Sequence, residues 1–172
     1  MNRSGVRRPE LKILSRESMV AERARLRKAG LKLVFTNGCF DILHPGHIDY
    51  LLFARNQGDA LVVGVNSDSS VKRNKGQDRP IVPERDRALV LAGLESVDYV
   101  VVFEEDEPAP LVNEILPDVL VKGEDWRHFV SGREAVEAAG GKVVLAPIVP
   151  NRSTTDIIGR VLAIAARKGS EA

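Results

Sequence analysis

Short apolar runs recur along this chain and alternate with segments of helical pattern. The runs occupy residues 32–36, 60–66, 98–103, 118–122 and 142–146. They are nearly continuous in Val and Leu, as in strands that are covered on both faces. Helices are expected over residues 15–29, 46–57, 84–95, 108–116, 131–139 and 154–167. This alternation predicts an α/β fold: a doubly wound (Rossmann-like) five-stranded parallel sheet with helices on both faces.

Capping and breaking residues support these boundaries. Ser15 is a suitable N-cap and Gly30 a suitable stop for the first helix. Pro45 and Pro83 stand at first-turn positions, where a missing N–H costs nothing. The longest irregular piece is predicted over residues 67–82, and loops of that length in a compact domain are frequently functional.

Length, charge and cysteine content limit the classes of function. A chain of 172 residues suits one domain, predicted over residues 11–172 after a disordered basic leader at residues 1–10. A formal net charge of +1 provides no general attraction for nucleic acid, and the apolar runs are too short to cross a membrane. The single Cys39 excludes an internal disulfide and fits a reducing cytoplasm. As a nucleophile Cys39 lacks an evident base, so a small buried filler is the simpler interpretation.

The junction after the first strand carries two histidines where a helix begins. His44 and His47 are three residues apart, so both can face one ligand. Helix-start N–H groups favour anions, and Gly38 and Gly46 let the backbone approach a ligand closely. The pattern therefore indicates chemistry on a phosphate. Two alternatives stay open: a loop His44 with His47 bonded to a carbonyl, and a metal pair, which only three histidines in the chain disfavour.

Basic residues gather after the second strand. Lys72 and Lys75 lie beside Gly76, where the chain can fold over a triphosphate. Arg85 and Arg87 begin the following helix, and either can reach inward. The alternative interpretation is a solvated, charged loop.

Polar and aromatic residues follow the fourth strand, at the edge where doubly wound sheets bind ligands. Asp125 can accept from a sugar hydroxyl or a base amino group, and Trp126 can stack on a flat group. A turn with Trp126 as a core plug is the alternative.

The last helix begins with several donors. Ser153, Thr154 and Thr155 offer hydroxyls and new N–H groups to phosphate oxygens, and Arg152 adds charge. A plain helix cap is the alternative.

Three motifs together resemble a known family. Residues 37–47 resemble the H-x-G-H signature of the cytidylyltransferase-like nucleotidyltransferase superfamily, and residues 123–126 and 153–158 resemble its second and third motifs in the same order. The resemblance covers about residues 11–165. Within the superfamily the chain is most similar to bacterial heptose-1-phosphate adenylyltransferases, through residues 65–68, 72–76, 79–83, 103–106 and 116–123. Several of these are fused to a sugar kinase, for which this chain has no room, so a stand-alone form is expected.

The resemblance implies a role for each matching residue. His44 and His47 would donate to the α-phosphate, and Lys72, Lys75 and Arg87 would contact the reacting phosphates; these five form the expected catalytic set. The expected nucleotide-binding residues are Asn37, Gly38, Cys39, Phe40, Asp41, Gly46, Lys122, Gly123, Asp125, Ser153, Thr154 and Thr155. The expected acceptor-binding residues are Asp41, Asp68 and Trp126, and no residue is assigned to a metal.

The implied reaction joins ATP and a sugar phosphate. A phosphate oxygen of heptose 1-phosphate would attack the α-phosphorus in line, giving ADP-heptose and pyrophosphate without a covalent enzyme intermediate. Mg²⁺ is expected as a cofactor held mainly by the nucleotide phosphates and water, with Asp41 as the nearest protein candidate. The resemblance also implies a homodimer, with neither nucleic acid nor membrane as a partner.

Alternative functions remain. The pair Asp125 and Trp126 also resembles glycerol-phosphate cytidylyltransferases, whereas heptose enzymes can carry Tyr at the second position. A cytidylyltransferase acting on glycerol 3-phosphate is therefore the first alternative, and a nucleotide-sensing module without turnover is the second. A dinucleotide oxidoreductase is disfavoured because no G-x-G-x-x-G follows the first strand.

Overall fold

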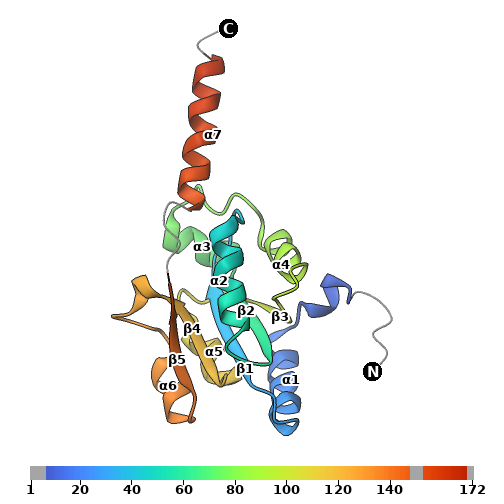
Figure 1. The fold of residues 1–172 in the computed structure, drawn as a ribbon. Coiled ribbons are helices and arrows are strands. Elements are labelled where there is room, and N and C mark those ends of the chain that lie inside the picture. Colours follow the sequence, from blue (N-terminus) through green and yellow to red (C-terminus); the bar gives the residue numbers. More distant parts are fainter. Residues whose placement is uncertain (1–6, 148–152, 170–172) are drawn as a thin grey trace.

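Five parallel strands form the centre of the molecule, as the sequence predicts (Figure 1). The structure is a computed structural model that describes residues 7–147 and 153–169. The strands are β1 (Leu33–Gly38), β2 (Ala60–Asn66), β3 (Tyr99–Phe103), β4 (Val119–Gly123) and β5 (Lys142–Ala146). They lie in the order β3-β2-β1-β4-β5, and each neighbouring pair is parallel.

Helices cover both faces of the sheet, and every predicted helix is present. They are α1 (Arg16–Lys28), α2 (Pro45–Arg55), α4 (Glu84–Ala92), α5 (Ala109–Ile115), α6 (Arg133–Ala138) and α7 (Thr154–Gly169). The described residues also contain α3 (Asp68–Lys75) and the 3-10 turns η1 (Pro9–Lys12) and η2 (Glu124–Trp126).

Alternate residues of each strand pack on opposite faces of the sheet. Leu33 and Phe35 of β1 join a core with α1, α5 and α6, whereas Val34 between them joins a core with α2 and α4. All three side chains are fully buried. Each such side chain stabilises the fold by about 1.5–3 kcal/mol, which explains why the strands are apolar at successive positions.

The segment after β2 differs from its prediction. Residues 67–82 are predicted as irregular, but α3 occupies most of the first half. The Ser67 side chain caps the helix by accepting from the N–H of Ser70, and the Ser70 hydroxyl donates to the carbonyl of Glu105. A short polar helix held by caps and tertiary hydrogen bonds has no apolar periodicity, so the pattern concealed it. Pro83 is likewise the N-cap of α4 and not a first-turn residue.

The predicted leader at residues 1–10 is wrong at its end, while residues 1–6 lie outside the described part. Pro9 and Glu10 belong to η1. Lys12 anchors this turn, because its ammonium donates to the carbonyls of Leu94 and Val97. The N–H of Leu14 then bonds to β3. The segment is therefore fixed to the body by polar contacts that the basic composition does not reveal.

Carboxylates hold the amino ends of the strands. Asp59 and Asp98 accept from the backbone N–H groups of Lys32 and Leu61, respectively. Asp118 accepts from the N–H of Leu33 and from both terminal nitrogens of the buried Arg23, at 2.8 and 2.9 Å. These bonds satisfy strand ends that would otherwise lack partners.

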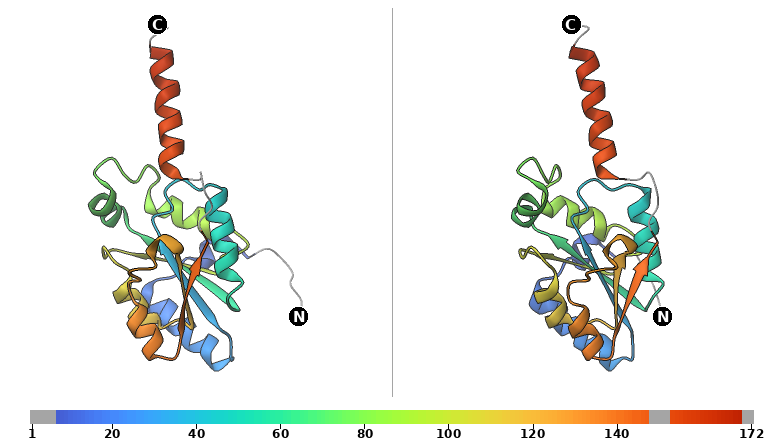
Figure 2. Two further views of the ribbon diagram at one scale, coloured as in Figure 1. Left: turned by 60° about the vertical axis from the view of Figure 1, so that its left-hand side comes forward. Right: turned by 90° about the vertical axis from the view of Figure 1, so that its left-hand side faces the viewer.

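The loops after β1 and β4 diverge at the other end of the sheet. β1 lies between β2 and β4, and the helices that follow β1 and β4 pack on opposite faces. Such a switch point leaves a crevice at the carboxyl ends of the strands. The helix α7 begins near this edge and then runs away from the body, as both views in Figure 2 show. Among the described residues, no helix combines the length and apolarity needed to cross a bilayer.

Candidate active site

A cavity of about 540 Å³ opens at the switch point. Its lining includes many of the residues that the sequence singles out: Asn37, Gly38, Cys39, Phe40, Asp41, His47, Lys75, Lys122, Trp126, Thr154 and Thr155. They come from β1 and its loop, α2, α3, β4, η2 and α7. The histidine turn and the start of the last helix, which are more than a hundred residues apart in sequence, thus face one space.

Tyr50 fixes the helix that carries His47. Its hydroxyl lies 2.5 Å from that of Thr36 in β1 and donates to the carbonyl of Val121 in β4. Burial raises the pKa of Tyr50 to about 12, so the phenol stays protonated. Because Tyr50 lies nearly one turn after His47, these two bonds set where α2 presents its imidazole.

The His47 ring is held by aromatic neighbours. It stacks on His44, with 3.8 Å between the ring centroids, and meets the Phe40 ring edge-on at 5.3 Å. Burial, with a smaller contribution from His44, lowers the pKa of His47 to about 4. The imidazole is therefore neutral at pH 7, and its buried Nδ1 has no hydrogen-bond partner among the described residues. A neutral imidazole still supplies one N–H donor.

A buried ammonium lies at the end of β4. Lys122 is 8% exposed, donates to the Asn37 side-chain oxygen at 2.8 Å and lies 5.1 Å from the centre of the Trp126 ring. Burial lowers the pKa of Lys122 to about 8. No carboxylate forms an ion pair with it among the described residues. A buried cation of this kind gains most from an anion that enters the cavity.

The start of α7 is tied to the first crossover. The Thr154 hydroxyl donates to the carbonyl of Ile42 at 3.2 Å, and Ser153 caps the helix by accepting from the N–H of Asp156. Thr154 and Thr155 line the cavity, whereas Ser153 does not. Helix-start N–H groups at this place favour an anion. Arg152, which the sequence predicts to add positive charge at this place, lies outside the described residues.

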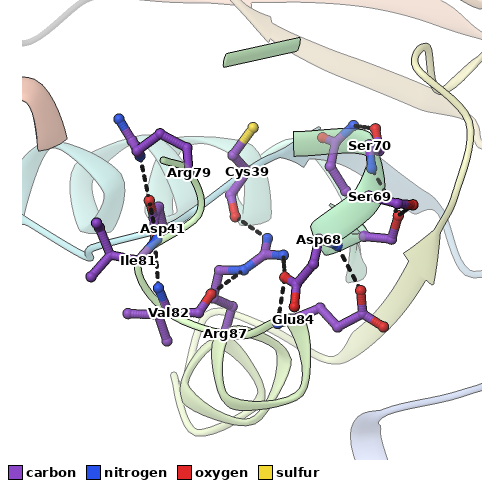
Figure 3. A network of polar contacts seen from close by, with 12 residues as sticks. Cys39, Asp41, Asp68, Ser69, Ser70, Arg79, Ile81, Val82, Glu84 and Arg87 are labelled. Atoms are coloured by element: carbon purple, nitrogen blue, oxygen red, sulfur yellow. Dashed lines mark hydrogen bonds and ion pairs between the residues drawn. The ribbon is translucent and has the colours of Figure 1, made fainter. Parts of the chain in front are cut away.

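Asp41 acts as a clasp for the segment after α3. Its carboxylate accepts from the N–H groups of Ile81 and Val82 and pairs with Arg79 at 2.6 Å (Figure 3). Burial alone would raise the pKa of Asp41, but these donors outweigh it and the pKa lies below its ordinary value of 3.8. Although Asp41 lines the cavity, its oxygens are committed to this clasp, so the structure does not support its predicted role in ligand or metal binding.

Replacing Asp41 with Asn should lower stability by about 2 kcal/mol, because a charged acceptor with several donors is lost. Thermal unfolding should show a fall in Tm of about 4–8 °C, while the exposed matched control Asp49→Asn leaves Tm unchanged. A carboxylate whose pKa is lower in the folded than in the unfolded state stabilises the fold at pH values above its unfolded pKa. This stabilisation is lost as the pH falls through the folded pKa. The Tm difference from wild type should therefore close below pH 3.8; a constant difference down to pH 2 would contradict the clasp.

Arg87 does not reach the cavity. Its side chain is fully buried, and its nitrogens donate to the carbonyls of Val82 and Cys39 and to the Asp68 carboxylate at 2.9, 2.5 and 2.7 Å (Figure 3). The guanidinium joins α4 to the loop after β1 and to α3. These contacts give Arg87 and Asp68 protein partners away from the cavity lining, which favours a structural role, and the catalytic and acceptor-binding roles expected for them stay predictions.

Other predicted site residues also lie off the cavity lining. Lys72 is exposed on α3, and Lys75 alone of the two lysines lines the cavity. The remaining predicted residues outside the lining are His44, Gly46, Gly123, Asp125 and Ser153. The His44 ring stacks on the His47 ring, and the donor role expected for His44 stays a prediction. Gly38 lines the cavity where a β-carbon would come within 3.0 Å of the Phe40 ring, so a small residue is needed there.

Several lining residues were missed by the sequence reasoning. They are Asn66, Asn74, Arg79, Asp106, Glu107, Pro108, Phe129 and Ser131. Asn66 ends β2, and Asp106 and Glu107 follow β3. The rule that carboxyl ends of parallel strands converge would have found these three. Phe129 and Ser131 lie in a loop, where no such rule applies.

The described residues do not form a metal cage. No group of three His, Cys, Asp or Glu side chains gathers among them. Burial raises the pKa of the Cys39 thiol despite nearby Lys75, so this residue is a poor thiolate ligand or nucleophile. The donor set instead consists of ammonium, imidazole, amide and hydroxyl groups, which suit phosphate oxygens.

Known proteins resemble the chain along most of its length. A family model described as Cytidylyltransferase-like matches residues 35–160. The chain is 58% identical over 135 residues to the bifunctional protein HldE of Rhodopseudomonas palustris, and 50% identical over 151 residues to that of Methylobacillus flagellatus. The matches cover 78% and 87% of this chain but 28% and 31% of the relatives. This chain thus spans less than a third of their length.

Solved structures resemble the fold. A lipopolysaccharide core biosynthesis protein from Thermoplasma volcanium is 34% identical with a TM-score of 0.57, over 70% of this chain and 98% of that one. A pantoate-beta-alanine ligase from Francisella tularensis, complexed with beta-gamma ATP and beta-alanine, has a TM-score of 0.59 over 84% of this chain and 74% of that one. At 20% identity the second likeness concerns the fold alone.

Proposed function

This chain belongs to the cytidylyltransferase-like family and is a nucleotidyltransferase, and from that premise we propose that it transfers AMP from ATP to heptose 1-phosphate, releasing pyrophosphate. The observation that carries the proposal is the shared cavity, in which His47, Lys122 and the start of α7 supply donors to one space. The bifunctional relatives and the lipopolysaccharide core protein fit a sugar phosphate as acceptor.

Phosphate charge is the first obstacle to this reaction. The acceptor phosphate and the triphosphate repel each other, and catalysis of nucleotidyl transfer consists mainly of positioning and charge neutralisation. Lys122 and Lys75 bring positive charge to the cavity. The acceptor oxygen is already a competent nucleophile, so the reaction needs no strong base.

Charge that develops at the α-phosphate needs a fixed donor. His47 is neutral and held by its ring contacts, so it donates an N–H without reorganising during the reaction. The leaving pyrophosphate would take the hydroxyls and N–H groups of Thr154 and Thr155, where the start of α7 favours negative charge. In this proposal His47 therefore contacts the α-phosphate, while Thr154 and Thr155 contact the leaving pyrophosphate.

Magnesium enters this proposal as part of the nucleotide substrate. Mg²⁺ prefers phosphate and water oxygens to a dedicated protein cage, which fits the chemistry of the donor set described above. When bound, it neutralises triphosphate charge. The residues of this chain then orient the Mg·ATP complex through its phosphates.

An assay of nucleotide against acceptor tests the function. Pyrophosphate release is measured with ATP or CTP, each combined with heptose 1-phosphate or glycerol 3-phosphate. We expect ATP with heptose 1-phosphate to give a kcat/KM at least about 100-fold above the other pairs, because a site built to pair with one base and one sugar rejects a partner that leaves its polar groups unmatched. Preference for CTP with glycerol 3-phosphate would establish the alternative cytidylyltransferase instead.

The homodimer forms part of the same proposal. Val161, Leu162 and Ile164 of α7 are 60%, 64% and 47% exposed, a face that a second copy of the chain would cover. A monomer mass at micromolar concentration in sedimentation equilibrium would contradict this.

A further inference from the structure

Part of the cavity lining differs in chemistry from the donor-rich part. Asp106 and Glu107 follow β3, and Trp126, Phe129 and Ser131 follow β4. These loops lead into α5 and α6, which share one face of the sheet, whereas α2 with its imidazole packs on the other. The carboxylates and Phe129 therefore come from loops on one face of the sheet and the His47 imidazole from the other, while Lys122 at the end of β4 lies 5.1 Å from the centre of the Trp126 ring.

Glu107 is anchored in this region. The hydroxyl of Ser131, a residue only 7% exposed, donates to Glu107 Oε2 at 3.0 Å. An ionised carboxylate only accepts hydrogen bonds and has about four lone-pair positions on its two oxygens. The bond from Ser131 uses one of these positions, and Glu107, which lines the cavity, keeps acceptor positions for a ligand.

Two aromatic rings remain open beside this carboxylate. Phe129 is 57% exposed and Trp126 is 49% exposed, and both line the cavity. Large apolar rings left at a cavity mark a binding surface. A phosphate is a poor occupant because the Glu107 carboxylate repels anions; the Asp106 carboxylate is paired with Arg73 at 2.6 Å and adds little to this repulsion. Hydroxyl groups on a carbon ring fit, since their O–H groups donate to carboxylates while the C–H faces lie on aromatic rings.

We propose that Glu107, Ser131 and Phe129 form a subsite for neighbouring hydroxyls of a sugar, an inference that rests on the proposed function. The opposed charges orient a sugar phosphate in the cavity. Its phosphate is drawn toward Lys122 and Lys75, and its hydroxyls toward Glu107. In dinucleotide-binding folds a carboxylate likewise accepts a hydrogen bond from a ribose hydroxyl.

A second cavity shows that this region has room for more than a small polyol. Its volume is about 390 Å³, and it shares Glu107, Phe129 and Ser131 with the first cavity. The subsite thus lies where the two spaces meet. A seven-carbon sugar has more hydroxyls to place in these two spaces than glycerol has. The ribose of the nucleotide is the other possible source of neighbouring hydroxyls.

Steady-state kinetics of Glu107→Gln, Ser131→Ala and Phe129→Ala test the subsite. The exposed Glu95, which lines neither cavity, provides the matched control Glu95→Gln. We expect Glu107→Gln to raise KM for heptose 1-phosphate about tenfold, the value of a hydrogen bond to a charged group, with kcat, KM for ATP and Tm nearly unchanged. A deoxy analogue of the sugar phosphate should have a KM about tenfold higher than the parent compound with the wild-type protein. With Glu107→Gln the same analogue should show no further rise in KM.

The arms of the experiment separate the two sources of hydroxyls. A tenfold rise in KM for ATP, reproduced in wild type by 2′-deoxy- or 3′-deoxy-ATP, supports the subsite with ribose as its occupant. Turnover by all three variants with both KM values unchanged overturns the subsite and leaves the proposed function intact. Absence of turnover by the wild-type chain with ATP and any sugar phosphate overturns the proposed function and the subsite with it.

Discussion

Alanine in place of His47 is expected to lower kcat at least about 100-fold, because removing one preorganised donor from a transition state costs roughly 3 kcal/mol or more. The effect should fall on kcat and kcat/KM together, as it does when an interaction exists only in the transition state. His44→Ala should lower kcat less, because the expected contribution of His44 is to hold the His47 ring by stacking on it. Pyrophosphate release gives the rates, and thermal unfolding should show little change in Tm.

The protonation state of His47 adds a second test of the same role. Burial lowers the pKa of His47 to about 4, so its imidazole is already neutral near pH 6.5, where an ordinary histidine titrates. The pH profile of kcat/KM, which reports the free enzyme and the free substrates, should therefore show no step near pH 6.5 that depends on His47, whereas a step from the second ionisation of a substrate phosphate persists in His47→Ala. A step there that disappears in His47→Ala would contradict the neutral donor, and near-wild-type turnover in both histidine variants would remove them from the mechanism.

Alanine in place of Arg87 is expected to destabilise the fold by about 3 kcal/mol, because two carbonyls and the Asp68 carboxylate lose their donor. For a chain of this length, Tm should fall by about 6–12 °C. Arg85→Ala, an exposed neighbour on the same helix, is the matched control and should leave Tm unchanged. Arg87→Lys keeps the charge but not the forked geometry, so its Tm should also fall.

Rates measured at low temperature decide between the two interpretations of Arg87. If the side chain is structural, the folded Arg87→Ala protein retains much more of its kcat than His47→Ala does. If Tm is unchanged and kcat falls as far as in His47→Ala, the guanidinium reaches the reacting phosphates and the buried network of Figure 3 does not describe the working enzyme.

The fold followed from the sequence because its signals are local and repeated. Strands buried on both faces are apolar at successive positions, as at residues 60–66, and this pattern needs no tertiary information. The helix α3 was not predicted because it is held by the cap at Ser67 and by the hydrogen bond from Ser70 to Glu105, a residue far along the chain. Patterns of residue type carry no signal for such a contact.

The site was predictable where sheet topology decides it. His47, Lys122 and Thr154 stand at strand ends or helix starts, and a doubly wound sheet brings these places together. Side-chain direction was not predictable. Arg87 and Asp41 carry charges suited to a ligand, yet each is committed to protein partners, and a charged residue type does not reveal whether its partner is substrate or protein.

The two ends of the sheet have different roles, because carboxylates bind the amino ends of the strands while the cavity lies at the carboxyl ends. Asp59, Asp98 and Asp118 keep the strands in register at one end, while the loops at the other end line the cavity. Selection can therefore alter the chemistry of a descendant enzyme at the loop end without loosening the scaffold. The same separation allows an engineer to randomise residues 106–107 and 126–131 for new acceptors while the opposite end keeps the protein folded.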